Sequence, residues 1–318
     1  MKILYTNFHA GDGGGHTTYI TVLARGLAAH HTLHVAAPAS SRVLRMVGEE
    51  GTAQTIEIGF RSGLRDLSSQ REDLRRLRDH VREQQFDVIH ANGARDHRMV
   101  IRACAGLSPR PAIIFTKHNS KPSNSLGNWL RARRGTDRVI AVSAHTRDLL
   151  LRSPYRRVPI DVVRNGIDLQ HYAPATAQDA ASMRAAWTHD PDALILASSA
   201  GTDPHKGWID LVRAVARMAP DIAAHVHIVV AGKPIGTALL EEVRTLGMAD
   251  RFHYAGLVDD VRPVIAGADA GFVLSWDIET ISFACREMMA MGKPVMASNY
   301  AGLPENIHVG QDGWVVPA

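Results

Sequence analysis

Short apolar runs alternate with amphipathic segments along the whole chain, and this pattern predicts buried strands separated by helices. In the first half, the predicted strands are Lys2–Tyr5, Leu33–Ala37, Phe86–His90, Ala112–Asn119 and Val139–Ser143. Between them, helical spacing of apolar residues predicts helices over Thr17–Ala29 and Ser68–Gln84. Strands that alternate with helices are typical of an α/β protein with parallel sheets.

The second half repeats the same alternation after a turn at Asn165–Asp168 and a linker with the sequence APATAQDAAS. Its predicted strands are Ala193–Ala197, His227–Ala231, Ala270–Leu274 and Pro294–Ala297, and its predicted helices include Ser182–Trp187 and Trp208–Met218. A chain of 318 residues is long enough for two domains of roughly 150 residues. We therefore predict one domain over residues 1–172 and another over 173–318.

Two carboxylates mark the stretch from Asp269 to Ala297. Glu279 stands where a polar elbow, Ser275–Thr280, is expected to enter a helix, and Glu287 follows eight residues later. On a helix this spacing puts both side chains on nearly the same face, roughly 12 Å apart. Carboxylates accept hydrogen bonds, so the pair could hold two hydroxyl-bearing parts of one elongated ligand. The alternative is an ordinary solvated helix face.

Composition and charge narrow the class of protein. With 45% hydrophobic and 21% charged residues, the chain is typical of a soluble globular protein, and no apolar run is long enough to span a bilayer. The first 16 residues do not resemble a signal peptide, and two cysteines, Cys104 and Cys285, do not suggest a disulfide framework. We expect a cytoplasmic protein.

Positive charge is concentrated in the first half. Residues 1–172 contain 26 Lys and Arg against 15 Asp and Glu, whereas the remainder contains 10 against 17. This asymmetry suggests that the first half meets an anionic partner. No nucleic-acid-binding motif is present, so we expect no nucleic acid; an anionic glycan or peripheral contact with the inner face of a membrane remains open. A segment with Trp129 among the cations Lys121, Arg131 and Arg133 could contact an acceptor or a membrane, or it could be an ordinary surface helix.

Several motifs in a fixed order resemble glycosyltransferase family 4, the retaining enzymes of GT-B fold. The matching segments are Glu279-x7-Glu287, Glu287–Ala290, Gly292–Val295, Ala301–Glu305 and the turn Asn165–Asp168. The resemblance implies two Rossmann-like domains that face each other across a cleft, with the donor held by the second. It also implies that Glu279 grips a hydroxyl of the donor sugar and that Glu287 grips the ribose hydroxyls. The family chain usually continues beyond its G-W-V-V strand, whereas this sequence ends at Ala318.

A glycine-rich loop follows the first strand. Gly11-x-Gly13 would begin a dinucleotide fingerprint, but His16 stands where its last glycine belongs, so NAD binding is not expected. Glycines there still let the backbone approach an anion at the start of a helix, although a plain flexible turn is the alternative. The resemblance places this loop at the cleft and implicates Gly14, Gly15 and His16 in donor binding.

Two further positions gain meaning from their place at strand ends, where open α/β sheets bind ligands. His118 stands near the end of the strand predicted at Ala112–Asn119. The resemblance implies that it contacts the transferred sugar near its anomeric carbon. Lys206 matches the family lysine on the donor diphosphate, but Gly201 replaces the arginine that normally accompanies it, and Lys233 could substitute. The remaining implied donor contacts are Leu257, near the base, and Thr280, Ile281 and Ser282, in an elbow that lacks the usual G-F-G.

These features together predict a retaining, metal-independent glycosyltransferase without a cofactor, whose substrate is a nucleoside-diphosphate sugar. His118, Glu279 and Lys206 are the candidate catalytic residues. The acceptor would be a saccharide or glycolipid, with an envelope glycan such as a lipopolysaccharide favoured by the basic first half. Two alternatives stay open. The scaffold could serve a sugar-nucleotide epimerase or hydrolase, or a non-catalytic nucleotide-sugar-binding protein.

Overall fold

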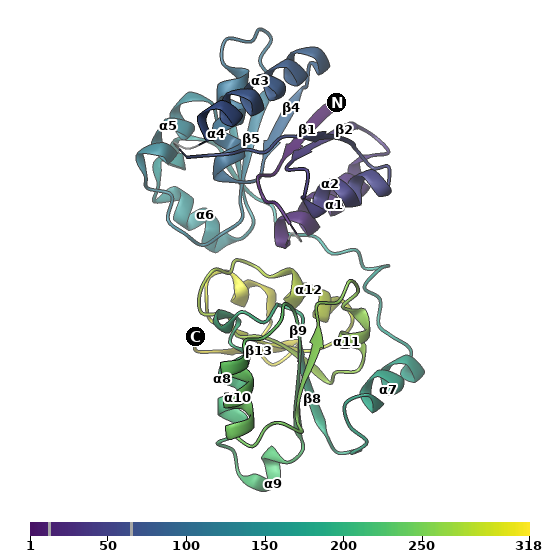
Figure 1. Cartoon of the computed structure of the whole chain (residues 1–318). Coiled ribbons are helices and arrows are strands. Elements are labelled where there is room, and N and C mark those ends of the chain that lie inside the picture. Colours follow the sequence, from purple (N-terminus) through teal and green to yellow (C-terminus); the bar gives the residue numbers. More distant parts are fainter. Residues whose placement is uncertain (12–13, 64–65) are drawn as a thin grey trace. The chain divides into compact units, whose positions relative to one another are not determined.

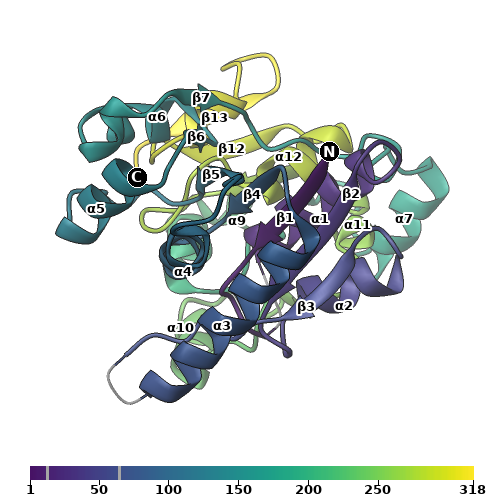
Figure 2. The same ribbon diagram turned by 90° about the horizontal axis from the view of Figure 1, so that it is seen from above.

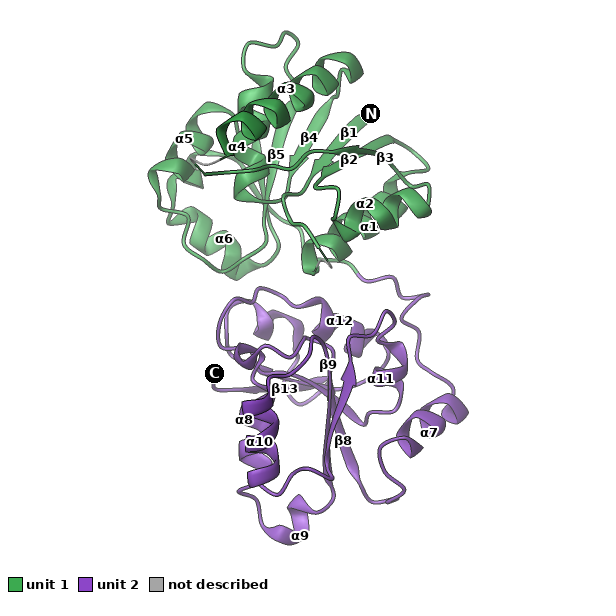
Figure 3. Cartoon of the chain, viewed as in Figure 1, with its two compact units in different colours: residues 1–166 green, residues 167–318 purple. Residues whose placement is uncertain are grey.

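The computed structural model describes residues 1–11, 14–63 and 66–318. The chain forms two compact units, Met1–Gly166 and Ile167–Ala318, each built on its own parallel sheet (Figures 1 and 3). Both sheets are parallel with helices between successive strands, which is the α/β architecture that the alternating pattern predicts.

The first unit is a seven-stranded sheet in the order β3-β2-β1-β4-β5-β6-β7. Its elements are β1 (Lys2–Thr6), α1 (Gly15–Leu27), β2 (Thr32–Ala37), α2 (Arg42–Glu49), β3 (Gln54–Glu57), α3 (Leu67–Gln84), β4 (Val88–Ala91), α4 (Ala94–Cys104), β5 (Ala112–Lys117), α5 (Leu126–Arg134), β6 (Arg138–Ala141), α6 (Ala144–Leu151), the 3-10 helix η2 (Pro154–Arg157) and β7 (Ile160–Val162). Figure 2 shows α3 and α4 lying over the central strands. Leu77 and Val81 of α3 pack there against Leu4 and Ile89, which forms the main core of this unit.

The second unit is a six-stranded sheet in the order β10-β9-β8-β11-β12-β13. Its elements are α7 (Ala177–Ala185), β8 (Leu194–Ser198), the 3-10 helix η3 (Pro204–Lys206), α8 (Trp208–Val215), α9 (Pro220–Ala223), β9 (Val226–Ala231), α10 (Thr237–Thr245), β10 (Phe252–Gly256), α11 (Arg262–Ala266), β11 (Ala270–Val273), α12 (Phe283–Ala290), β12 (Val295–Ser298), the 3-10 helix η4 (Leu303–Asn306) and β13 (Gly313–Val316). All six residues of β9 are buried, as expected for a central parallel strand. Trp208, fully buried at the start of α8, stacks on Phe252 and fills the core of this unit.

Two expectations differ from the structure. The contact boundary between the units falls at Gly166, six residues before the predicted one. The helix expected at Ser182–Trp187 begins earlier, at Ala177, because the hydroxyl of Thr176 caps it by accepting from the Asp179 amide. The exposed side of α3 carries ion pairs, with Arg75 held between Glu72 and Asp79. Within the described ranges, no helix has the length and apolarity that crossing a bilayer requires.

Gly207, which joins η3 to α8, offers a test of this fold. Its φ is +77°, and a Cβ there would lie 2.2 Å from the Leu274 carbonyl oxygen. The left-handed backbone and the clash together should make Gly207→Ala lower the free energy of unfolding by about 3 kcal/mol. Thermal unfolding of the variant measures this loss.

Gly236→Ala is the matched control, because Gly236 has a φ of −64° and a Cβ there meets nothing within 4 Å. It should change stability by less than about 0.5 kcal/mol. Equal melting temperatures for the two variants would contradict the close approach of Gly207 to Leu274.

Candidate functional site

The strand order of the second unit brings two loops together at one edge of its sheet. The chain winds outward from β8 through β9 and β10, and then returns to pair β11 with β8 in parallel. The loops after β8 and β11 therefore leave the same edge side by side, at the point where open α/β sheets bind ligands. A backbone hydrogen bond of 3.0 Å from Trp276 to the His205 carbonyl ties the two loops to each other.

An ion pair joins the predicted lysine to the predicted carboxylate across these loops. Lys206 Nζ lies 2.9 Å from Glu279 Oε2, and the two side chains are only 17% and 11% exposed. The carboxylate also accepts from the Thr280 amide at 3.0 Å and from the Ser275 hydroxyl at 3.4 Å. The pair is thus fixed at the sheet edge, with each charge neutralised by the other.

The expectation that Glu279 and Glu287 share one helix face is wrong. Helix α12 begins at Phe283, after the N-cap Ser282, so Glu279 lies four residues before the helix. The elbow reaches the helix through a strained backbone instead, with φ values of 47° at Ile278 and 49° at Ser282. Left-handed conformations are costly for a β-branched residue and gather at functional sites.

The other elbow residues face the protein interior. Ile281 is fully buried, and its carbonyl accepts from the side chain of Asn306 at 2.8 Å. Thr280 and Ser282 are each 8% exposed, and the hydroxyl of Ser282 caps α12 by accepting from the Cys285 amide. The side chains of these three residues face inward and hold the elbow in place. A ligand at the elbow would therefore contact their backbone atoms.

Glu287 lies on α12 and contacts a residue that sequence patterns did not single out. It is 8% exposed and is hydrogen bonded to the hydroxyl of Tyr172, which precedes α7 in the same unit. Burial raises the pKa of the Glu287 carboxyl to about 7, although the hydrogen bond from Tyr172 acts in the opposite direction. This carboxyl therefore changes its charge near neutral pH.

Gly232 packs closely against the backbone of the loop in which Gly201 replaces the family arginine. A Cβ on Gly232 would lie 2.7 Å from the Thr202 amide nitrogen and 2.9 Å from the Gly201 Cα. The hydroxyl of Thr202 donates to the Lys233 carbonyl at 2.6 Å, which ties the exposed Lys233 to the loop after β8. Leu257, at the end of β10, is 63% exposed and free to contact a ligand.

In the first unit, the equivalent sheet edge holds His118. The strand order reverses between β1 and β4, and Asn92 directly follows β4. The Asn92 amide donates to the carbonyls of Thr6 and His90, so its Oδ1 is left to accept from His118 Nε2 at 3.0 Å. This bond requires the proton on Nε2, and in the neutral ring it leaves Nδ1 as an acceptor.

Histidines and a tyrosine surround His118. Its ring centre lies 4.5 Å from that of His16 and 4.6 Å from that of Tyr19. Burial, followed by the neighbouring His16 and His90, lowers the pKa of His118 well below its usual value, and burial lowers the pKa of His16 to about 3. Both rings are neutral at physiological pH and can orient a hydroxyl but cannot supply positive charge.

The glycine-rich loop leads directly into this cluster through His16. Gly14, with a φ of +146°, is the N-cap of α1, and Gly15 begins the helix. Both glycines are exposed, and His16 Nδ1 is a buried nitrogen without a hydrogen-bond partner among the described residues. Gly13, the second glycine of the loop, lies outside the described residues.

Comparisons with known proteins match both units. Residues 13–171 match the family model described as Glycosyltransferase Family 4, and residues 192–318 match the one described as Glycosyl transferases group 1. A D-inositol 3-phosphate glycosyltransferase of Rhodococcus opacus is 32% identical over 192 residues, which are 57% of this chain and 42% of that protein. An alpha-maltose-1-phosphate synthase of Mycolicibacterium smegmatis is 30% identical over 226 residues, 64% of this chain and 57% of that protein. The chain thus spans about half the length of these curated relatives.

Solved structures share the fold. The crystal structure of Anabaena Alr3699/HepE in complex with UDP superposes with a TM-score of 0.82, at 19% identity, over 100% of this chain and 86% of that one. The same protein in complex with UDP-glucose gives a TM-score of 0.80 at 20% identity, over 100% and 85% of the two chains. At this identity the likeness establishes the two-unit α/β architecture of GT-B enzymes.

The pKa of Glu287 makes stability depend on pH. Because the folded state raises this pKa from 4.5 to about 7, it holds the proton more tightly than the unfolded chain does. The contribution of Glu287 to stability is therefore complete below pH 4.5 and is lost as the pH rises through 7. Glu287→Gln, which stays neutral, should exceed the wild type by about 3 kcal/mol in unfolding free energy at pH 8 and match it at pH 4.5. Urea unfolding at the two pH values measures the difference.

The exposed Glu241 on α10 provides the control. Glu241→Gln should change stability by less than about 0.5 kcal/mol at either pH. An equally small change in Glu287→Gln at pH 8 would contradict the prediction, because it would mean that the folded state ionises the Glu287 carboxyl without a cost in stability.

Proposed function

Because the chain belongs to glycosyltransferase family 4, we propose that it transfers a sugar from a nucleoside-diphosphate donor to a saccharide hydroxyl, with retention at the anomeric carbon. The observation that carries the proposal is the Lys206–Glu279 pair at the edge where β8 and β11 meet. One partner is a cation suited to a diphosphate, and the other is an acceptor suited to a sugar hydroxyl. A donor that reaches both groups would exchange their mutual ion pair for contacts with its own charge and hydroxyls.

The leaving group explains why a cation belongs there. Transfer releases a nucleoside diphosphate, so negative charge develops on its β-phosphate, and a positioned lysine stabilises that charge. Lys206 takes this role, and Glu287 accepts hydrogen bonds from the two hydroxyls of the donor ribose. Leu257 and the elbow backbone of Thr280, Ile281 and Ser282 complete the proposed donor site.

Gly201 leaves the diphosphate one cation short of the family pattern. Lys233 is the group of the second unit best placed to supply it, since its backbone is held by Thr202, the neighbour of Gly201. Its exposed side chain is free to reach a bound phosphate. We assign Lys233 this supporting role.

The stereochemistry that we propose depends on whether a carboxylate is available as a nucleophile. Retention through a covalent intermediate needs a carboxylate nucleophile close to the anomeric carbon. Glu279 is held by Lys206, Ser275 and the Thr280 amide, an environment that suits binding better than attack. We propose that the acceptor attacks and the nucleoside diphosphate departs on the same face of the sugar, without a metal ion or cofactor. Neutral His118 orients a sugar hydroxyl, and Gly14, Gly15 and His16 lie around His118.

The donor and acceptor are proposed at the level of chemical class. Structures of HepE contain UDP and UDP-glucose, which makes a uridine nucleotide the first donor to test. The acceptor is a saccharide or glycolipid of the cell envelope, in keeping with the basic first half of the chain. Synthesis of such a glycan would take place in the cytoplasm, with peripheral contact at an anionic membrane.

Glu279→Gln tests the proposed transfer. The variant keeps the shape of the side chain but loses the charge that binds Lys206, so the donor sugar is held poorly while Lys206 becomes free for phosphate. Transfer, measured as UDP release from UDP-glucose in the presence of a saccharide acceptor, should fall about 100-fold or more. UDP affinity, measured by calorimetry, should stay equal or become tighter.

Glu241→Gln, on the exposed side of α10, should leave both measurements unchanged. Retained turnover in Glu279→Gln would exclude this carboxylate from the reaction. Donor consumption by the wild type without acceptor would favour a hydrolase or epimerase, and binding without consumption would favour a nucleotide-sugar-binding protein, which the missing arginine makes the stronger alternative.

Lys233→Met tests the replacement cation. Loss of a charge-assisted hydrogen bond to phosphate should weaken UDP binding about ten-fold, while uridine, which has no phosphate, should be unaffected. Arg244→Met removes an exposed charge from α10 as a control and should change neither affinity. Equal UDP affinity in Lys233→Met and the wild type would show that the diphosphate is bound without this side chain.

A further inference from the structure

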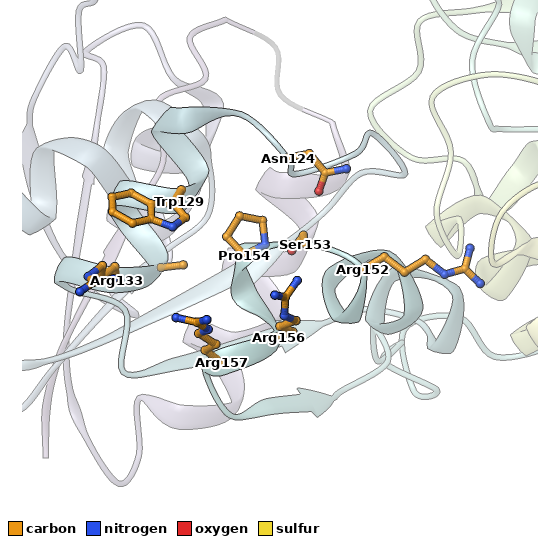
Figure 4. Close-up of a pocket in the computed structure, with 9 residues that line it drawn as sticks. Asn124, Trp129, Arg133, Arg152, Ser153, Pro154, Arg156 and Arg157 are labelled. Atoms are coloured by element: carbon orange, nitrogen blue, oxygen red, sulfur yellow. The ribbon is translucent and has the colours of Figure 1, made fainter.

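A basic cavity of about 450 Å³ lies in the first unit, between α5 and η2, and belongs to no site described so far. Figure 4 shows arginines from both elements around it, with Arg152 pointing away from the other three. Its lining residues are Asn124, Trp129, Ala132, Arg133, Arg152, Ser153, Pro154, Arg156 and Arg157. The volume matches that of sites for small ligands.

No carboxylate of the described residues neutralises the positive charge of this cavity. Among the described residues, Arg133, Arg156 and Arg157 have no carboxylate within 4.0 Å. Residues 121–157 contain only two acidic side chains, and each is already paired, Asp137 with Arg110 at 2.6 Å and Asp148 with Arg147 at 2.9 Å. The cavity therefore gathers guanidinium groups that repel one another unless an anion joins them.

The walls of the cavity are held in place by the core. Tyr155, between Pro154 and Arg156, is fully buried and stacks on Phe115 with ring centres 5.6 Å apart. Ser153 fixes the start of η2 through bonds to the Leu150 carbonyl and the Tyr155 amide. The arginines on either side of this anchor therefore emerge from a fixed backbone, which lowers the entropic cost of binding a ligand.

An aromatic surface borders the charged part of the cavity. Trp129 is 41% exposed, and the guanidinium carbon of Arg133 lies 5.2 Å from the centre of its ring. A partly exposed indole beside cations suits a ligand that has an apolar or sugar face next to an anionic group. Guanidinium groups in turn match the oxygen geometry of phosphate better than ammonium groups do.

We propose that this cavity binds a phosphate group through Arg133, Arg156 and Arg157, with Trp129 contacting the group that bears the phosphate. The phosphate can belong to a lipid headgroup in a membrane or to a soluble phosphorylated molecule. The proposal goes beyond the transfer reaction, because the donor residues Lys206, Glu279 and Glu287 all belong to the other unit. It adds a second anion site with its own partner.

The test compares two charge-matched double variants of the whole protein. Arg156→Gln/Arg157→Gln removes two charges from the cavity, whereas Arg71→Gln/Arg76→Gln removes two exposed charges from α3 in the same unit. Binding of inorganic phosphate is measured by calorimetry with UDP present to occupy the second unit. Binding to vesicles is measured by sedimentation, with phosphatidylglycerol in phosphatidylcholine against phosphatidylcholine alone.

We expect the cavity variant to lose about ten-fold or more in affinity for at least one of these probes, and the α3 variant to lose less than three-fold. Loss toward inorganic phosphate identifies a site for soluble phosphates, and loss toward phosphatidylglycerol vesicles alone identifies a headgroup site. Equal losses in the two variants, or no loss in either, would overturn the proposal. UDP affinity should be unchanged in both, and because the comparison is between variants, its outcome does not depend on whether the second unit binds UDP.

Discussion

The parallel pairing of β8 with β11 is the constraint on which the second unit depends. This pairing places two loops that are far apart in the sequence at the same edge of one sheet. Lys206 and Glu279, which are 73 positions apart, therefore meet at 2.9 Å. Without this pairing, a largely buried lysine and a largely buried carboxylate would lack each other as partners. Removing one partner of such a pair is costly because the other charge remains desolvated, so the fold and the site support each other here.

This ion pair also limits how a ligand can enter. A neutral molecule cannot release Lys206, because breaking the pair would leave two charges poorly solvated. A diphosphate brings more negative charge than the single carboxylate that it displaces, and a sugar brings hydroxyls that satisfy Glu279 after the exchange. The pair therefore favours a ligand that carries both groups at once, which is the chemistry of a nucleoside-diphosphate sugar.

Much of the fold followed from the sequence because strands and helices are local features. The six buried residues of β9 and the apolar side of α3 are apparent in their own segments. The geometry around Glu279 was harder to predict. A spacing of eight residues fits a helix but cannot reveal that the helix begins at Phe283, four residues after Glu279. Tyr172 had no local signal at all, because its contact with Glu287 depends on how the segment before α7 returns to α12.

The two proposed anion sites differ in what holds their cations before a ligand arrives. Lys206 is paired and largely buried, so a ligand there must compete with Glu279, and selectivity results from that competition. Arg156 and Arg157 are exposed and lack a carboxylate partner among the described residues, so an anion there meets no internal competitor. Such a site gains affinity from charge with little discrimination among phosphates, and salt screens it readily. The excess of basic residues in the first 172 positions thus acts most directly at an open surface, whereas the acidic second half binds its proposed donor through a few residues of fixed geometry.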